Sequence, residues 1–234
     1  MNTPPTIVWF YHDLRLSDHI ALSQAATRGP VVPLYILDDT FPEGGASKWW
    51  LHQALQNLSQ DFERSHLSFI LKKGEPLSVL RALIKQTGAQ SVTWSRRYEA
   101  SLAKRDSLIA DALRAEDIEV SIHSGFLLFE PEHIHTQTHT AFKVFTPFSK
   151  ACFAAPAPAP LLSAPKKLHG LPGLTTDDLE SWKLVPQLAK WPLGLKKTWK
   201  VGEKAANEML HQFIENNLTP YKTARDTALS ISMI

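Results

Sequence analysis

Short apolar runs alternate with helical patterns along the first 130 residues of the chain. The runs are rich in β-branched and aromatic residues and are bounded by polar or turn residues, which is typical of buried parallel strands. They lie at residues 6–11, 31–37, 67–71, 91–95 and 119–124. Between them, apolar residues recur every three or four positions, as on one face of a helix. The helical patterns cover Leu51–Phe62, Leu77–Ile84 and Leu102–Leu113.

This alternation predicts an α/β fold with a five-stranded, doubly wound parallel sheet of Rossmann-like type, covered by helices on both faces. We expect this domain to occupy residues 1–130. In such sheets ligands bind outside the carboxyl ends of the strands, near the point where the strand order reverses. A residue that directly follows a strand is therefore at the right height for a ligand contact.

The pattern changes in the second half of the chain. Residues 151–165 are rich in alanine and proline, which predicts an extended linker without a helix or a central strand. Little regular structure is expected as far as residue 200, because prolines continue to interrupt the sequence. These prolines are Pro172, Pro186 and Pro192.

One amphipathic helix is predicted near the end, from Glu203 to Asn216. Its apolar stripe consists of Ala206, Met209, Leu210, Phe213 and Ile214. The rest of the chain offers this stripe no obvious packing partner.

Composition narrows the class of protein only moderately. Of the 234 residues, 44% are hydrophobic and 21% are charged, which is ordinary for a soluble globular protein, and the net charge of +2 names no partner. Cys152 is the single cysteine, so an internal disulfide is excluded and a cytoplasmic location is expected. We recognise no signal peptide, and no apolar run reaches the roughly 20 residues of a membrane span.

Charged residues follow two of the predicted strands. Asp13, Arg15 and Asp18 lie after the first strand, where an arginine clamp that fixes the turn is favoured over a ligand-facing turn. Glu99 follows the fourth strand, where it either contacts a ligand or pairs with one of two neighbouring arginines, Arg96 and Arg97. No G-x-G-x-x-G motif is present, so the standard dinucleotide fingerprint is absent.

Three histidines in a polar segment have a spacing that raises the question of a metal site. They are His133, His135 and His139. No cysteine and no pattern of residues that would orient the imidazole rings accompanies them, so we expect no metal there. No Ser/His/Asp or Cys/His set stands out by its spacing, and we therefore name no catalytic residue.

Five segments of the chain resemble DNA photolyases and cryptochromes. They are WFYHDLRLSDHIAL (9–22), GGASKWWLHQAL (44–55), SRRYEASLAKRD (95–106), KVFTPFSKA (143–151) and WKVGEKAANEMLHQFIENNLTPYKTARD (199–226). Their order and spacing match the family from Thr6 to Asp226. Family members usually carry arginine where Tyr11 or His12 stands, and asparagine where His19 stands.

The resemblance implies the function of a longer protein. Family proteins have an α/β antenna domain, a long linker and a helical domain that binds FAD and damaged DNA. In light, their reduced FAD donates an electron to a cyclobutane pyrimidine dimer, which then splits. By resemblance, Tyr221 contacts FAD and Arg225 lies beside the bound DNA, where a phosphate contact would position the duplex.

The resemblance also implies that residues 131–200 are an interdomain linker and that residues 201–234 are only the start of the all-helical domain. In the family, the Y-x3-RD motif is followed by a proline and a Thr/Ser-rich turn for the flavin phosphates, whereas this chain ends in ALSISMI. We therefore expect a truncated protein, in which the missing helical domain would pack on residues 203–216. Alone, such a chain would neither retain FAD nor repair dimers.

By resemblance, a second chromophore of the deazaflavin or methenyl-folate type would serve as the light-harvesting antenna. Folate-binding members carry an Asn-Glu pair where Ser101 and Leu102 stand, which favours a flavin-like antenna or none. The residues that we expect to contact an antenna are Asp38, Lys48 and Glu99.

Three classes of function stay open. The chain is a photolyase fragment, a fragment of a light-signalling cryptochrome, or a stand-alone nucleotide-binding α/β module. The sequence before Ile234 does not separate the first two. The third is ranked last, because it would need neither the KVFTPF motif nor the linker and the final helix.

Overall fold

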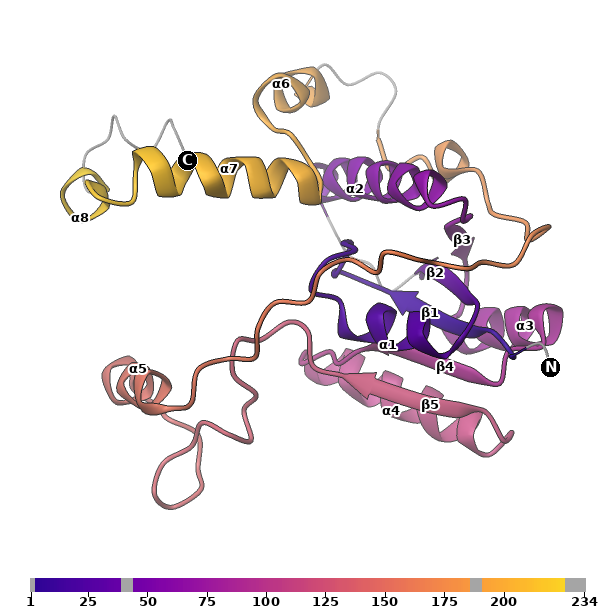
Figure 1. Cartoon of the computed structure of the whole chain (residues 1–234), viewed down its shortest axis with the longest axis horizontal. Coiled ribbons are helices and arrows are strands. Elements are labelled where there is room, and N and C mark those ends of the chain that lie inside the picture. The colour runs from indigo at the N-terminus through magenta and orange to yellow at the C-terminus, as the bar shows by residue number, and fades with distance from the viewer. Residues whose placement is uncertain (1–2, 39–43, 186–190, 226–234) are drawn as a thin grey trace. The chain divides into compact units, whose positions relative to one another are not determined.

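The computed structural model describes residues 3–38, 44–185 and 191–225 (Figure 1). Its contacts divide the chain into two compact units. The first unit comprises residues 1–42 and 61–178, and the second comprises residues 43–60 and 179–234. The two units are described separately.

The first unit contains a five-stranded parallel sheet. Its strands are β1 (Thr6–Phe10), β2 (Val31–Leu37), β3 (Ile70–Lys73), β4 (Ser91–Ser95) and β5 (Glu119–His123). Their order is β3-β2-β1-β4-β5, and every neighbouring pair is parallel. This arrangement confirms the predicted α/β fold class. Because the chain moves from β1 to β2 on one side and later returns to β4 on the other, the strand order reverses at β1.

Helices flank the sheet on both faces. α3 (Pro76–Thr87) and α4 (Ala100–Arg114) share a buried core with Ile7 and Trp9 of β1. Successive side chains of a strand point to opposite faces, so Phe10 lies on the other face. There its ring contacts His19, the N-cap of α1 (Ile20–Arg28), with the ring centroids 4.6 Å apart.

β3 begins later than the apolar run at residues 67–71 predicted. Leu67 and Phe69 are buried but precede the strand. The Leu67 N–H donates to the carbonyl of Phe62 at 3.1 Å, and the Phe69 and Phe62 rings stack with centroids 5.3 Å apart. The apolar character of these two residues therefore reflects core packing ahead of the strand.

The predicted linker contains more helix than its composition indicated. α5 (Phe145–Ala154) includes the first residues of the Ala/Pro-rich segment, so the prediction of no helix there was wrong. Pro147 occupies the first turn, where its missing N–H costs no helical hydrogen bond, and Pro156 follows the end of the helix. Pro192 likewise lies in the first turn of α6 (Trp191–Thr198).

Residues 155–178 contain neither helix nor strand, as expected for an extended segment. The segment is nevertheless attached to the first unit. The Val31 N–H donates to the carbonyl of His169 at 2.6 Å, and the Lys72 Nζ lies 2.9 Å from an Asp177 carboxylate oxygen. The predicted domain limits at residues 130 and 200 stay predictions.

The second unit consists of helices. They are α2 (Gly45–Arg64, as far as Gln60), the 3-10 helix η1 (Leu179–Trp182), α6, α7 (Glu203–Asn216) and α8 (Tyr221–Ala224). α2 contacts the later segment through Asn57, whose Nδ2 donates to the carbonyl of Val201 at 2.7 Å, and through Trp50, whose ring centroid is 5.8 Å from that of Trp199.

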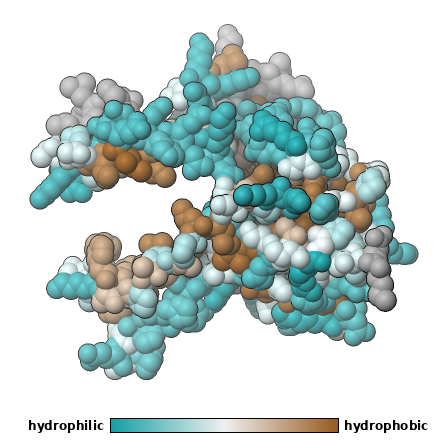
Figure 2. Space-filling model, viewed as in Figure 1, coloured by the Kyte–Doolittle hydropathy of each residue, from teal (hydrophilic) through white to brown (hydrophobic). Residues whose placement is uncertain are grey.

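α7 has the bounds that the sequence predicted. Much of its apolar stripe is exposed, and the space-filling view shows apolar surface on α7 and also on α5 (Figure 2). The packing of a further helical domain on residues 203–216 stays a prediction. Within the described ranges, the helices are too short or too polar to cross a bilayer.

Candidate functional site

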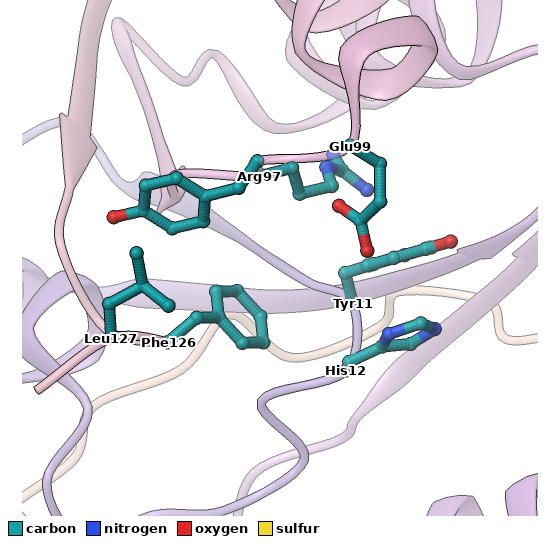
Figure 3. A pocket seen from close by; sticks show the side chains of 7 residues that line it. Tyr11, His12, Arg97, Glu99, Phe126 and Leu127 are labelled. Carbon is teal, nitrogen blue, oxygen red and sulfur yellow. The ribbon is translucent and has the colours of Figure 1, made fainter. Parts of the chain in front are cut away.

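A cleft of about 450 Å³ opens at the carboxyl ends of β1 and β4, in the first unit. This is the point where the strand order reverses, which is the usual ligand position in an open α/β sheet. Its walls combine aromatic, apolar and charged side chains from the segments that follow β1, β4 and β5 (Figure 3). They are Tyr11, His12, Arg97, Tyr98, Glu99, Phe126 and Leu127.

Arg97 is the most constrained charged group of the cleft. Its guanidinium carbon lies 4.2 Å from the ring centroid of Trp9 and 4.3 Å from that of Tyr11, so that two aromatic rings contact the cation. The residue is only 4% exposed, and burial lowers its pKa although the carboxylate of Asp106 opposes this shift. Its Nε donates to Asp106, whereas Nη1 and Nη2 have no hydrogen-bond partner among the described residues.

Asp106 belongs to a chain of alternating charges behind the cleft. Besides Arg97, it binds Arg105, whose Nε and Nη2 each lie 3.3 Å from its Oδ1. Arg105 in turn donates from Nη1 to Asp38 at 2.5 Å. Burial raises the pKa of Asp106, against the lowering effect of the two arginines. The four side chains link the end of β2 to the segment after β4.

The wall after β5 is held by polar contacts. The Tyr98 hydroxyl donates to the carboxylate of Glu130 at 2.6 Å, and Arg96 lies 2.6 Å from a carboxylate oxygen of Glu132. Burial, followed by this hydrogen bond to Glu130, raises the pKa of Tyr98. Arg15 donates from Nη2 to the carbonyl of Gly125 at 3.0 Å. These contacts fix the segment that supplies the apolar side chains of this wall.

The turn between β1 and α1 fixes the backbone of Tyr11. Asp13 is buried and accepts a hydrogen bond from the Tyr11 N–H at 2.9 Å, and its other oxygen lies 3.0 Å from His19 Nε2. His19 Nδ1 accepts the Leu22 N–H at 3.1 Å, so the proton of the neutral ring is on Nε2, facing Asp13. Burial raises the pKa of Asp13, but its contacts with His19 and Ser95 and the hydrogen bond from the Tyr11 N–H outweigh this effect and leave the pKa below its usual range.

The arginine clamp in this turn takes a different form from the predicted one. Arg15 lies 3.8 Å from the carboxylate of Asp18, but it donates mainly to the backbone carbonyls of Ser17 and Asp18. Asp13 binds His19 instead. Arg15 therefore fixes the backbone of the turn, and Asp13 fixes the start of α1.

Two of the three predicted antenna residues lie at or beside the cleft. Glu99 lines it from the N-cap position of α4, and the alternative ion pairs do not form, since Arg97 binds Asp106 and Arg96 binds the segment after β5. Asp38 lies behind it in the ion pair with Arg105. Lys48 lies in the first turns of α2, in the second unit. The antenna role of all three stays a prediction.

The predicted FAD and DNA residues lie together on the second unit. Tyr221 begins α8, and its ring contacts that of Phe213 with centroids 5.6 Å apart. The guanidinium carbon of Arg225 lies 5.8 Å from the Tyr221 ring centroid. Both residues are exposed, and their roles toward FAD and DNA stay predictions.

Several residues of the cleft were missed by the sequence reasoning. Arg97 was considered only as a partner of Glu99, and Tyr11 only as a departure from the family pattern. Phe126 was not considered. The available signal was position, because these residues closely follow β1, β4 and β5. Using it requires the strand order, which brings β1, β4 and β5 together.

Comparisons with known proteins extend over nearly the whole chain. The family model described as DNA photolyase matches residues 6–166. The deoxyribodipyrimidine photo-lyase of Agrobacterium fabrum is 37% identical over 97% of this chain and 48% of its own length. Cryptochrome-2 of Arabidopsis thaliana is 31% identical over 92% of this chain and 37% of its own length.

A solved structure gives the same result. The crystal structure of a bacterial class III photolyase from Agrobacterium tumefaciens matches with a TM-score of 0.93 and 37% identity, covering 97% of this chain and 48% of that one. The chain thus spans about half the length, or less, of the relatives named here.

Proposed function

Because the chain belongs to the DNA photolyase family, we propose that it is the light-harvesting part of a deoxyribodipyrimidine photo-lyase. The match of the family model to residues 6–166 carries this proposal. The activity assigned to the complete protein is light-dependent repair of cyclobutane pyrimidine dimers in DNA. We expect a cytoplasmic protein, in agreement with the single Cys152.

FAD, when bound in the complete protein, supplies the electron that splits the dimer. Within this chain, Tyr221 and Arg225 are the proposed contacts to FAD and DNA. They form an exposed edge next to Phe213, so they can orient a flavin or a phosphate but cannot enclose either. A contact from Arg225 to a DNA phosphate would position the duplex without reading its sequence.

The cleft is the proposed antenna site. A bound antenna chromophore of the deazaflavin or methenyl-folate type absorbs light and passes the energy on. The residues of the cleft suit such a planar ring, because Phe126 offers aromatic surface and Arg97, held against the Tyr11 ring, offers buried donors without a partner among the described residues. Asp38 supports the site through Arg105, and Glu99 faces it. Lys48 stays a proposed contact from the second unit.

The test is a binding measurement on the purified chain. Tyr11→Ala removes the ring that packs on Arg97 and should weaken binding of a deazaflavin or a methenyl-folate about tenfold, as expected for the loss of a desolvated cation–π contact worth about 1–2 kcal/mol. Tyr11→Phe retains the ring and should bind like the wild type. Phe153→Ala is the matched control, because Phe153 is a fully exposed aromatic residue of the same unit that does not line the cleft.

Binding is followed by chromophore absorbance after gel filtration and by fluorescence titration. If neither chromophore binds, or if Tyr11→Ala binds as tightly as Phe153→Ala, the cleft is not the antenna site. The family assignment would stand in either case, since it rests on the sequence match.

A cryptochrome is the second candidate, favoured by the 31% identity to Cryptochrome-2 over 92% of this chain. The two differ in their action on DNA. Light-dependent loss of dimers from an oligonucleotide, measured with a complete protein that contains this chain, supports the photolyase. Light-induced absorbance changes without such loss support the cryptochrome. A stand-alone nucleotide-binding module is disfavoured by the match along the linker.

A further inference from the structure

We propose that Arg97 and Glu99 together recognise a lactam edge of the ring bound in the cleft, meaning a ring carbonyl next to a ring N–H. The inference rests on the proposed function, since it takes the cleft to be a chromophore site. It adds the chemical group that selects the ligand and the two side chains that recognise it.

Arg97 supplies the donors. Its Nε is used by Asp106, but Nη1 and Nη2 have no partner among the described residues, although the residue is only 4% exposed. A buried donor without an acceptor is costly, so a ligand that brings an acceptor gains the corresponding free energy. Contacts with the rings of Trp9 and Tyr11 restrain the guanidinium, and its N–H groups therefore point in fixed directions.

Glu99 supplies the acceptor. It follows Arg97 by two residues and occupies the N-cap position of α4, yet its side chain makes no capping hydrogen bond. No hydrogen bond or ion pair joins its carboxylate to another described residue, while its backbone carbonyl accepts the Ala103 N–H. Figure 3 shows its carboxylate turned toward the same space as the Arg97 guanidinium. An ionised carboxylate only accepts hydrogen bonds, so its partner on the ligand must be an N–H or O–H group.

Together the two side chains present donors beside an acceptor. A planar ring that carries C=O next to N–H matches this pair with two hydrogen bonds. Phe126 provides aromatic surface for a face of such a ring, while Tyr11, whose ring lies between Arg97 and His12, holds the guanidinium in place. Pterins, flavins and deazaflavins all contain this edge, so the geometry defines a group that they share and does not choose among them.

The local charges argue against recognition of a phosphate at this point. Among the described residues, the positive charges of Arg97 and Arg105 are matched by Asp106 and Asp38 in direct ion pairs. Glu99 then leaves a net negative charge. A phosphate would be repelled, whereas a neutral lactam carries no such penalty.

The experiment compares riboflavin with riboflavin methylated at the imide nitrogen, which has the same ring but lacks the N–H. Flavin fluorescence is titrated with the purified chain in the dark. The wild type should bind the methylated compound about tenfold more weakly, the effect of one hydrogen bond to a charged group. FMN should bind within about threefold of riboflavin, since its phosphate gains little from exposed charges.

Two variants assign the effect to the residues. Glu99→Ala should bind both compounds with equal affinity, because no acceptor is left to distinguish them. Arg97→Lys should weaken both about tenfold, since it keeps the charge but loses Nη1 and Nη2. Glu116→Ala, just beyond the other end of the same helix, is the matched control and should retain the preference. Circular dichroism establishes that each variant is folded.

The outcomes separate the two proposals. If riboflavin binds but methylation makes no difference, or if the preference survives in Glu99→Ala, the lactam proposal is wrong and the chromophore site stands. An FMN affinity more than tenfold above that of riboflavin would contradict the charge argument and with it the proposal. If no flavin binds the wild type, the lactam proposal fails, while the deazaflavin and methenyl-folate titrations decide separately on the chromophore site.

Discussion

Replacing Asp106 by alanine tests the ion pairs behind the cleft. Asp106 is buried and is the partner of Arg97 Nε, and it also lies within 3.3 Å of two nitrogens of Arg105. The substitution leaves Arg97 charged, 4% exposed and without a carboxylate. Arg105 keeps its ion pair with Asp38, so most of the penalty falls on Arg97.

Removing one partner of a buried ion pair costs about 3–5 kcal/mol, because the remaining charge is left uncompensated. We expect a value near the lower end, about 3 kcal/mol, because the two aromatic rings that contact Arg97 continue to attract the cation. For an m-value of about 2 kcal/mol/M, this lowers the urea midpoint by about 1.5 M.

The assay is urea unfolding followed by far-UV circular dichroism. The matched control is Glu119→Ala, which breaks the ion pair between Arg28 and Glu119, whose side chains are 48% and 52% exposed. A pair this exposed contributes at most about 1 kcal/mol, so the control should shift the midpoint by no more than about 0.5 M.

A double variant identifies the source of the cost. Arg97→Met added to Asp106→Ala removes the uncompensated charge and should recover part of the lost free energy of unfolding. If Asp106→Ala is no more destabilising than Glu119→Ala, or if the double variant recovers nothing, the burial of an unpaired guanidinium is not what the substitution costs.

Two further predictions concern acid stability and FAD. Burial opposes ionisation of Asp13, but its contacts with His19, Ser95 and the Tyr11 N–H outweigh burial, and its folded-state pKa lies below the unfolded value of about 3.9. Its contribution to stability is therefore present above that pH and is lost as the pH falls toward the folded-state pKa. Asp13→Asn should therefore be less stable at neutral pH and lose less stability on acidification, as measured by urea midpoints across this range. The chain of 234 residues should retain less than one FAD per chain after gel filtration, because Tyr221 and Arg225 form an exposed edge; stoichiometric FAD in the protein peak would contradict this.

The sequence predicted the strands and the helices α2, α3, α4 and α7 because each has a local signal. Apolar runs bounded by turn residues located β1, β2, β4 and β5 within a residue or so, and the helical stripe located α7. The signal failed at Leu67 and Phe69, which are buried but do not pair with a neighbouring strand. It also failed for α5 and α6, in which a proline lies in the first turn of the helix. Composition alone does not reveal the position of a proline within a helix.

The cleft was less predictable because it depends on contacts between distant segments. Arg97 lies close to Glu99 in sequence, which made an ion pair between them the simplest expectation. Its carboxylate partner is Asp106, which lies farther along, inside α4. The pairing of Arg97 with Asp106 depends on how α4 lies on the sheet, which the sequence does not show. Because Arg97 is bound to Asp106, Glu99 faces the cleft.

The departures from the family pattern have different consequences. His19 stands where members usually carry asparagine. Its Nδ1 accepts the Leu22 N–H as an asparagine oxygen would, so α1 still begins with a side-chain cap. Tyr11 stands at one of the two positions where arginine is usual. An arginine there would place a second cation against Arg97, whereas the tyrosine ring stacks on it at 4.3 Å. At Tyr11 this wall of the cleft is therefore aromatic, and its ring stabilises the buried guanidinium that an arginine in the same place would repel.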